Sequence, residues 1–157
     1  MKTLIGLSAL TLCAITAHAG TLDKSCQVLE CSPGDKAVTY ATQSEMYWAC
    51  PTQELAEYTD TLIGLAAAVY ELTGKLNNIS PMTGEPVFEG ETERLIEMKR
   101  HAAHVETFDQ ATSLCRKGRA GIRVSIMNNP GKGSAIWVQN DRTKDTFWIS
   151  AGMLDKR

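Results

Sequence analysis

The stretch TQELAEYTDTLIGLAAAVYELTGKL, residues 52–76, decides most of the fold. Its apolar side chains recur at alternating intervals of three and four residues, the spacing that lines one face of an α-helix. They are Leu55, Tyr58, Leu62, Leu65, Val69, Leu72 and Leu76. Thr52 follows Pro51 and suits a helix N-cap, and Glu54 suits the positive end of the helix dipole. The sequence therefore predicts an amphipathic helix over residues 52–76.

A second apolar stripe runs along the same helix. It consists of Ile63, Ala66, Ala67 and Tyr70, so the middle of the helix is apolar on more than one face. Such a helix belongs at the centre of a fold rather than on its surface. Gly64 and Ala68 are small and about one turn apart, which allows another backbone to come close, either within the fold or in a homodimer.

A second helix is expected over residues 91–117, after a loop that contains two prolines and two glycines. Its apolar side follows the same spacing, through Leu95, Met98, Ala102, Val105, Phe108 and Thr112. Glutamates stand at its start, Arg116 and Lys117 at its end, and Gly118 stops it. Two long helices joined by a loop favour an antiparallel hairpin.

The hairpin selects a disulfide pairing. Four cysteines follow the N-terminal segment, namely Cys26, Cys31, Cys50 and Cys115, and they allow three connectivities. The apolar layers of the hairpin fall into register when paired residue numbers sum to 167, as for Leu62 with Val105. Cys50 then lies opposite position 117, within a turn of Cys115. We therefore expect one disulfide between Cys50 and Cys115 and another between Cys26 and Cys31.

After Gly118 the apolar pattern changes to alternation, which is typical of β-strands. The runs GIRVSIM, SAIWVQ and TFWIS are separated by the turn-forming segments NNPGKG and NDRTKD. They predict a three-stranded antiparallel meander whose apolar face covers the first helix. On the opposite, more exposed face, Trp137 and Trp148 are expected to pair across strands. The expected fold class is α+β, a disulfide-linked antiparallel helical hairpin packed on a C-terminal three-stranded antiparallel β-meander.

The N-terminus has the pattern of a secretory signal peptide. One lysine precedes an apolar run that is too short to span a bilayer, and Ala17 and Ala19 form a cleavage pattern before Gly20. A lipoprotein would use Cys13, but Leu12 stands where a small residue is required. We expect residues 1–19 to be the signal peptide and 20–157 a single domain of a bacterial periplasmic or secreted protein, with no membrane anchor. An even number of cysteines suits that oxidising compartment.

The charge and the motifs exclude several activities. Without Lys2 the chain has 15 basic and 18 acidic side chains, which gives no case for nucleic acid as a partner. There is no G-x-S-x-G motif, and NNPGKGS lacks phosphate-loop spacing. Glu97, His101 and His104 are spaced i, i+4 and i+7, which suits a metal site or a hydrolase and forms the alternative hypothesis. Otherwise we expect no cofactor, no metal and no catalytic residue.

A basic cluster supports a different function. The segment CRKGRAGIR carries Arg119 and Arg123 beyond the positions that a helix end would use. Arginine and tryptophan are frequent at protein interfaces. We therefore expect Arg119, Arg123, Trp137 and Trp148 to form a partner-binding face.

The segment YWACPTQELAEYTDTLIGL resembles the start of small exported accessory proteins that occur with conjugative transfer and type IV secretion genes, the KikA type. The resemblance covers about 20 residues and carries no site residue. It implies a non-enzymatic periplasmic helper of transfer, or of its lethal side effects in recipients. Together with the missing catalytic motifs, this predicts an accessory protein that acts by binding another protein of the cell envelope.

Overall fold

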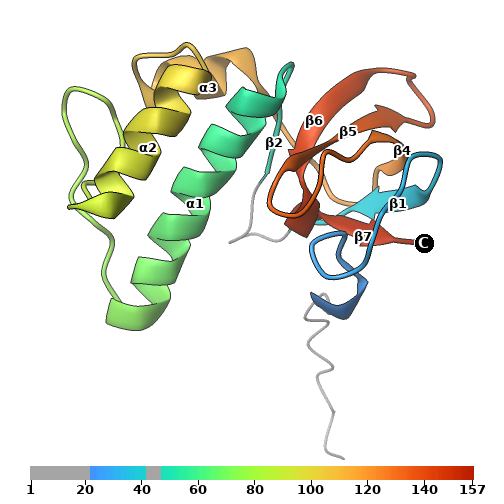
Figure 1. Ribbon diagram of the computed structural model, residues 1–157, viewed down its shortest axis with the longest axis horizontal. Helices are drawn as coiled ribbons and strands as arrows, with labels where there is room; N and C mark the ends of the chain where they lie inside the picture. The colour runs from blue at the N-terminus through green and yellow to red at the C-terminus, as the bar shows by residue number, and fades with distance from the viewer. Residues whose placement is uncertain (1–21, 42–46) are drawn as a thin grey trace, which may run out of the picture.

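The computed structural model describes residues 22–41 and 47–157, and in it three helices stand beside a curved antiparallel sheet (Figure 1). The helices are α1 (Gln53–Thr73), α2 (Glu91–Ala102) and α3 (Phe108–Leu114). The larger sheet contains β1 (Lys36–Thr39), β4 (Arg123–Asn128), β5 (Ala135–Asn140), β6 (Thr146–Ser150) and β7 (Leu154–Lys156). A small sheet of β2 (Trp48–Ala49) and β3 (Arg116–Lys117) lies where the two parts meet, and short 3-10 turns cover Leu22–Lys24 and Ala151–Met153. The expected mixed α and β composition is confirmed.

The first predicted helix is confirmed almost at its expected bounds. Thr52 caps α1, because its hydroxyl accepts a hydrogen bond from the Leu55 amide at 3.3 Å. The helix ends at Gly74, whose φ of 68° lies in the left-handed region that glycine adopts without strain. Leu55, Tyr58 and Leu62 are buried, so the first half of the predicted stripe faces the core.

The second predicted helix is wrong as a single element. It is divided into α2 and α3 by residues 103–107, where His104 has a φ of 54°. Thr107 then caps α3 by accepting a hydrogen bond from the Gln110 amide at 3.1 Å. Arg116 and Lys117, expected as the charged end of this helix, pair with β2 instead.

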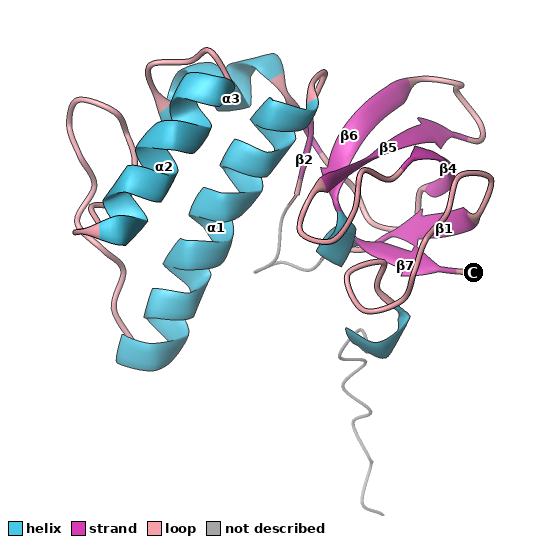
Figure 2. Ribbon diagram, in the orientation of Figure 1, coloured by secondary structure: helices cyan, strands magenta, loops and turns pink. Residues whose placement is uncertain are grey.

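The break in the helix also changes the register of the hairpin. Lys99 of α2 pairs with Glu57 of α1 at 2.6 Å, and their numbers sum to 156 rather than 167. The apolar contacts that were expected between the two helices near their connecting loop are absent, since Leu72 is 86% exposed and Met98 is 59% exposed. The two helices do run side by side, but over a shorter overlap than predicted (Figure 2).

The predicted meander forms the middle of a larger sheet. The strand order is β6-β5-β4-β1-β7, and each neighbouring pair is antiparallel. Strands β4, β5 and β6 follow the predicted runs, and Trp137 lies opposite Trp148. The short strands β1 and β7 extend this sheet beyond β4, so the arrangement of three strands alone is not the one observed.

The packing of the sheet against the helices is the reverse of the expectation. Its most apolar face, which includes Val124, Ile136 and Ile149, packs with Tyr47 and Leu154 in one buried cluster. The helices pack in a second buried cluster. The sheet contributes Ala135 to this cluster, and the partly buried Trp148 packs against it. The tryptophan face, not the aliphatic face, therefore lies against the helices.

Both predicted disulfides are present. Cys26 and Cys31 close a small loop beside the aliphatic cluster, and Cys50 and Cys115 join the end of β2 to the end of α3. The predicted signal peptide, with Cys13, lies outside the described residues. Among the residues that the structure describes, no helix is long and apolar enough to cross a membrane.

Candidate protein-binding surface

The predicted tryptophan pair forms at the junction of sheet and helices. The two indole rings stack with centroids 6.3 Å apart and an interplanar angle of 21°. Both side chains are half-buried, and Trp148 packs against the helical cluster. Much of this pair is therefore used to join the two parts of the molecule.

The structure does not bring the predicted arginines to the tryptophan pair. Asn128 of β4 lies opposite Trp137, whereas Arg123 is at the other end of that strand, five residues away. At about 3.3 Å per residue, roughly 16 Å of strand lies between Arg123 and Asn128, the residue beside Trp137. The carbonyl of Arg119 accepts hydrogen bonds from the hydroxyls of Thr39 and Tyr47, on the side of the aliphatic cluster. The four residues proposed as one face therefore lie in at least two places.

The alternative site at Glu97, His101 and His104 loses the geometry on which it depended. The spacing requires one continuous helix, but α2 ends at Ala102 and His104 has left-handed backbone angles. Glu97 and His101 are neighbours, 3.8 Å apart, and both are exposed. Within residues 22–41 and 47–157, no three histidine, cysteine, aspartate or glutamate side chains gather closely enough to hold a metal ion.

Exposed apolar side chains concentrate instead on the helical part. Of the twelve large apolar side chains that are exposed in the described chain, eight lie between residues 70 and 98. Six of them follow one another through the end of α1 and the loop after it, and we call them the distal apolar surface: Tyr70, Leu72, Leu76, Ile79, Met82 and Val87. Leu72 and Met82 are 86% and 85% exposed. Exposed apolar side chains gathered in one part of a protein commonly mark an interaction site.

The pairing of the helices explains this exposure. Because Lys99 lies beside Glu57 and the helices are antiparallel, Glu91 at the start of α2 falls near the level of Leu65. The last two turns of α1, which carry Tyr70 and Leu72, therefore extend beyond α2 (Figure 1). Only the loop of residues 74–90 accompanies them.

That loop is held by hydrogen bonds. The Val87 amide donates to the Asn78 carbonyl at 2.8 Å, and the Ser80 amide donates to the Glu85 carbonyl at 2.8 Å. The Asn77 side chain donates to the Val87 carbonyl at 2.7 Å. The exposed residues Ile79, Met82 and Val87 are thus presented by an ordered turn rather than by an unsupported strand of chain.

A buried polar network fastens the loop to both helices. Glu85 is 6% exposed, and its carboxylate accepts a hydrogen bond from the Tyr58 hydroxyl and another from the Arg100 guanidinium, each at 2.6 Å. Burial, reinforced by the negative charge of Glu85, strongly raises the pKa of Tyr58, which therefore stays a neutral donor. The position of the loop is consequently fixed by α1 and α2 together.

A groove of about 280 Å³ lies between this loop and α2. Residues 80–88 form one side, with Val87 and Phe88 among them, and the other side comes from Glu93, Ile96, Glu97 and Arg100. Val87 belongs both to the groove and to the distal apolar surface. The groove is therefore continuous with that surface.

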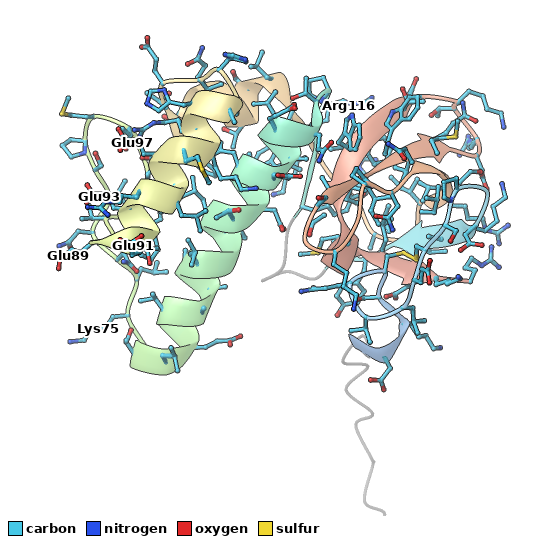
Figure 3. The ribbon with its side chains drawn as sticks, viewed as in Figure 1. Lys75, Glu89, Glu91, Glu93, Glu97 and Arg116 are labelled. Atoms are coloured by element: carbon cyan, nitrogen blue, oxygen red, sulfur yellow. A yellow bond between two sulfur atoms is a disulfide. The ribbon has the colours of Figure 1, made fainter. Side chains whose placement is uncertain are left out.

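Charge is segregated between the two parts of the molecule. Residues 53–114 contain eleven acidic and four basic side chains, whereas residues 116–157 contain three acidic and nine basic side chains. Figure 3 shows Glu89, Glu91, Glu93 and Glu97 along the outer side of α2 and the loop before it, with Lys75 below them. The distal apolar surface thus has an acidic border.

Sequence reasoning missed this surface because it assigned Tyr70, Leu72 and Leu76 to the apolar faces of the first helix and interpreted residues 77–90 only as a loop. The acidic excess over residues 53–114 was a readable signal, but it was interpreted only as helix-dipole pairing. Comparison with protein-family models, with curated proteins and with solved structures finds no match for this chain.

Proposed function

We propose that this is a small exported accessory protein that acts without catalysis, by binding another protein through the distal apolar surface. The observation that carries the proposal is the concentration of exposed apolar side chains on an ordered loop and helix end. Fully burying one such side chain contributes about 1.5–3 kcal/mol to association before the costs of binding. Leu72, Leu76 and Met82 are each more than 70% exposed, so a partner that covers them buries most of their apolar surface.

The charges around the surface favour a different protein over a second copy. In a two-fold symmetric dimer the same patch meets itself, so the acidic borders of two copies would face each other. Glu89, Glu91 and Glu93 are all exposed there. Among the described residues, the nearby Arg94 already pairs with Glu91, and Arg100 of the adjoining groove pairs with a buried carboxylate. A contact between two such borders is repulsive, and the homodimer allowed by the sequence is the weaker hypothesis.

An envelope setting fits the covalent structure. Two disulfides in a small domain are typical of proteins from oxidising compartments such as the periplasm or the cell exterior. The likeness of residues 47–65 to KikA-type proteins, together with the expected signal peptide, supports a role beside an envelope secretion or conjugation system. The partner is then a protein of that system.

A site-specific photocrosslinker tests the proposed surface. Placed at residue 82, it should give a discrete crosslinked product in envelope extracts of the source cell, identifiable by mass spectrometry. Placed at Met127, an exposed apolar residue of β4, it should give no such product. The identified protein, purified, should bind the wild type and lose affinity for a Leu72→Ser/Leu76→Ser variant. Equal crosslinking from both positions, or unchanged affinity of that variant, contradicts the proposal.

The aromatic and basic residues expected from the sequence remain a second proposed contact. Arg119 and Arg123 are exposed, and Trp137 and Trp148 are half-buried. A triple variant, Arg119→Ala/Arg123→Ala/Trp148→Ala, measured with the same purified partner, separates the two surfaces. Loss of affinity there, with no loss for the Leu72 and Leu76 variant, would place the contact on the sheet.

A further inference from the structure

We propose that the partner presents a basic segment, and that one of its lysine or arginine side chains enters the groove between α2 and the loop of residues 80–88. This inference rests on the proposed function and names the chemistry of the partner. The groove, its acidic border and the charge of the helical part each contribute to it.

The interior of the groove suits the stem of a long side chain. Val87, Phe88 and Ile96 provide apolar walls, and the volume of about 280 Å³ is below the usual range for small-molecule pockets. Lysine and arginine bury their methylene stems against such walls while the charged group remains near the mouth. The size and lining therefore fit one side chain better than a free metabolite.

The acidic groups of the groove differ in what they can still bind. Both oxygens of the Glu85 carboxylate accept hydrogen bonds, from Tyr58 and from Arg100, so this charge is already compensated. Glu93 forms no ion pair within the described residues, and the one ion-pair partner of Glu97 among them is His101, at 3.8 Å. Arg100 also lines the groove, but its guanidinium is paired with Glu85. The carboxylates at Glu93 and Glu97 are consequently open to a cation brought by the partner.

The helix dipole explains why an acidic residue stands at position 93, but it does not explain the one at position 97. Glu93 lies in the first turn of α2, where negative side chains stabilise a helix. Glu97 lies in the middle of the helix, beyond the reach of that effect, and four residues from Glu93, so both side chains project from the same flank. The pair forms one edge of the groove, opposite Val87 and Phe88.

The acidic excess of the whole helical part also favours a partner with a basic segment. Its eleven acidic and four basic side chains attract a basic segment from a distance and repel an acidic one. The distal apolar surface next to the groove requires that this segment also be apolar on one side. An amphipathic helix with lysine or arginine beside its apolar stripe satisfies both requirements.

A designed peptide tests this chemistry without knowledge of the natural partner. The probe is a fluorescent amphipathic helix with a leucine face and a lysine face, and the matched probe replaces every lysine by glutamate. By fluorescence anisotropy, the lysine probe should bind the protein at ~50 mM salt and bind at least fivefold more weakly at ~300 mM salt, because added salt screens exposed charges. The glutamate probe should bind at least tenfold more weakly than the lysine probe at low salt.

Paired variants locate the contact. Glu93→Gln/Glu97→Gln should weaken binding of the lysine probe by about fivefold, since two exposed charge pairs are lost. Glu30→Gln/Glu54→Gln removes the same net charge from exposed positions outside the groove and should change the affinity by less than about twofold. Equal effects of the two double variants, or equal binding of both probes, overturn the inference.

The outcomes separate this inference from the proposed function. If the crosslinked partner requires Leu72 and Leu76 but not Glu93 and Glu97, the surface is correct and the basic chemistry is wrong. If the lysine probe depends on Glu93 and Glu97 while crosslinking at residue 82 fails, the proposed function is wrong. Self-association at low salt that disappears in Glu93→Gln/Glu97→Gln would identify the occupant as the basic sheet of another copy, and would overturn the commitment to a different protein.

Discussion

Cys50 and Trp148 exchange two backbone hydrogen bonds. The Cys50 amide donates to the Trp148 carbonyl at 3.0 Å, and the Trp148 amide donates to the Cys50 carbonyl at 2.8 Å. Since Cys50 is also bonded covalently to Cys115, the end of α3 is tied through one residue to β6. This relationship couples the helical part to the sheet at the point where α1 begins.

Removing this disulfide should destabilise the protein strongly. It closes a loop with a sequence separation of 65 residues, for which the chain-entropy model gives about 4 kcal/mol. We expect Cys50→Ala/Cys115→Ala to lower the free energy of unfolding by about that amount in urea denaturation. Cys26→Ala/Cys31→Ala is the control, because its separation of 5 residues predicts a smaller loss. An equal or larger loss from the short bridge would contradict this account.

The two helical segments show which sequence signals were sufficient. The pattern of α1 continues over more than five turns with a threonine cap and a glycine stop, and the helix forms as predicted. Residues 91–117 keep the same apolar spacing across the break, so periodicity alone could not reveal it. The readable signal was Thr107 followed three residues later by Gln110, a helix-start pattern that the structure uses: Gln110 accepts from the Glu106 amide at 2.9 Å.

The sheet and the binding surface were harder to predict for a different reason. Strand β1 has four residues and β7 has three, and β1 pairs with residues more than 80 positions away. Local patterns carry little information about such pairings. The exposure of Leu72 follows from where α2 begins relative to α1, a consequence of the break after Ala102, so no inspection of Leu72 itself could show it.

The buried network at Glu85 should be more sensitive to the loss of its cation than to the loss of its hydroxyl donor. Arg100→Met leaves the buried Glu85 carboxylate without its ion pair, and we expect a loss of about 3–5 kcal/mol in the free energy of unfolding. Tyr58→Phe removes one hydrogen bond and should cost about 1–2 kcal/mol. Denaturant titrations of both variants check this order.

A compensating substitution distinguishes charge from shape at this site. Arg100→Met/Glu85→Gln removes both charges, so most of the stability lost in Arg100→Met should return. If the double variant is as unstable as Arg100→Met, the cost arises from packing of the Arg100 side chain and not from the unpaired carboxylate.

The Glu57–Lys99 ion pair should make stability depend on pH. Burial alone would raise the pKa of Glu57, but hydrogen bonds from Lys99 and Gln53 outweigh it and hold that pKa below its ordinary value of 4.5. A carboxyl with a lowered folded-state pKa stabilises the fold above its unfolded pKa and loses that contribution as the pH falls through the folded pKa. We therefore expect the difference in unfolding free energy between wild type and Lys99→Met to be about 1 kcal/mol at pH 7 and to shrink below pH 4.5.

The control for this pH dependence is an exposed lysine that lies outside the pair. Lys132 is exposed on the turn between β4 and β5, and Lys132→Met should leave the pH profile of stability unchanged. A difference between wild type and Lys99→Met that stays constant from pH 7 to pH 3 would show that Glu57 is not the linked group.

Two glycines should respond in opposite directions to the same substitution. A Cβ atom at Gly118 would overlap the ring of Tyr47, which is buried and fixed by its hydroxyl contacts to Arg119, so neither group can move cheaply. We expect Gly118→Ala to lower the free energy of unfolding by about 2–3 kcal/mol. Gly64 lies inside α1, where a Cβ meets nothing within 4 Å, so Gly64→Ala should raise it by about 0.5–1 kcal/mol through helix propensity. Thermal unfolding of both variants measures these changes. Stabilisation by Gly118→Ala would mean that the Tyr47 ring does not lie against Gly118.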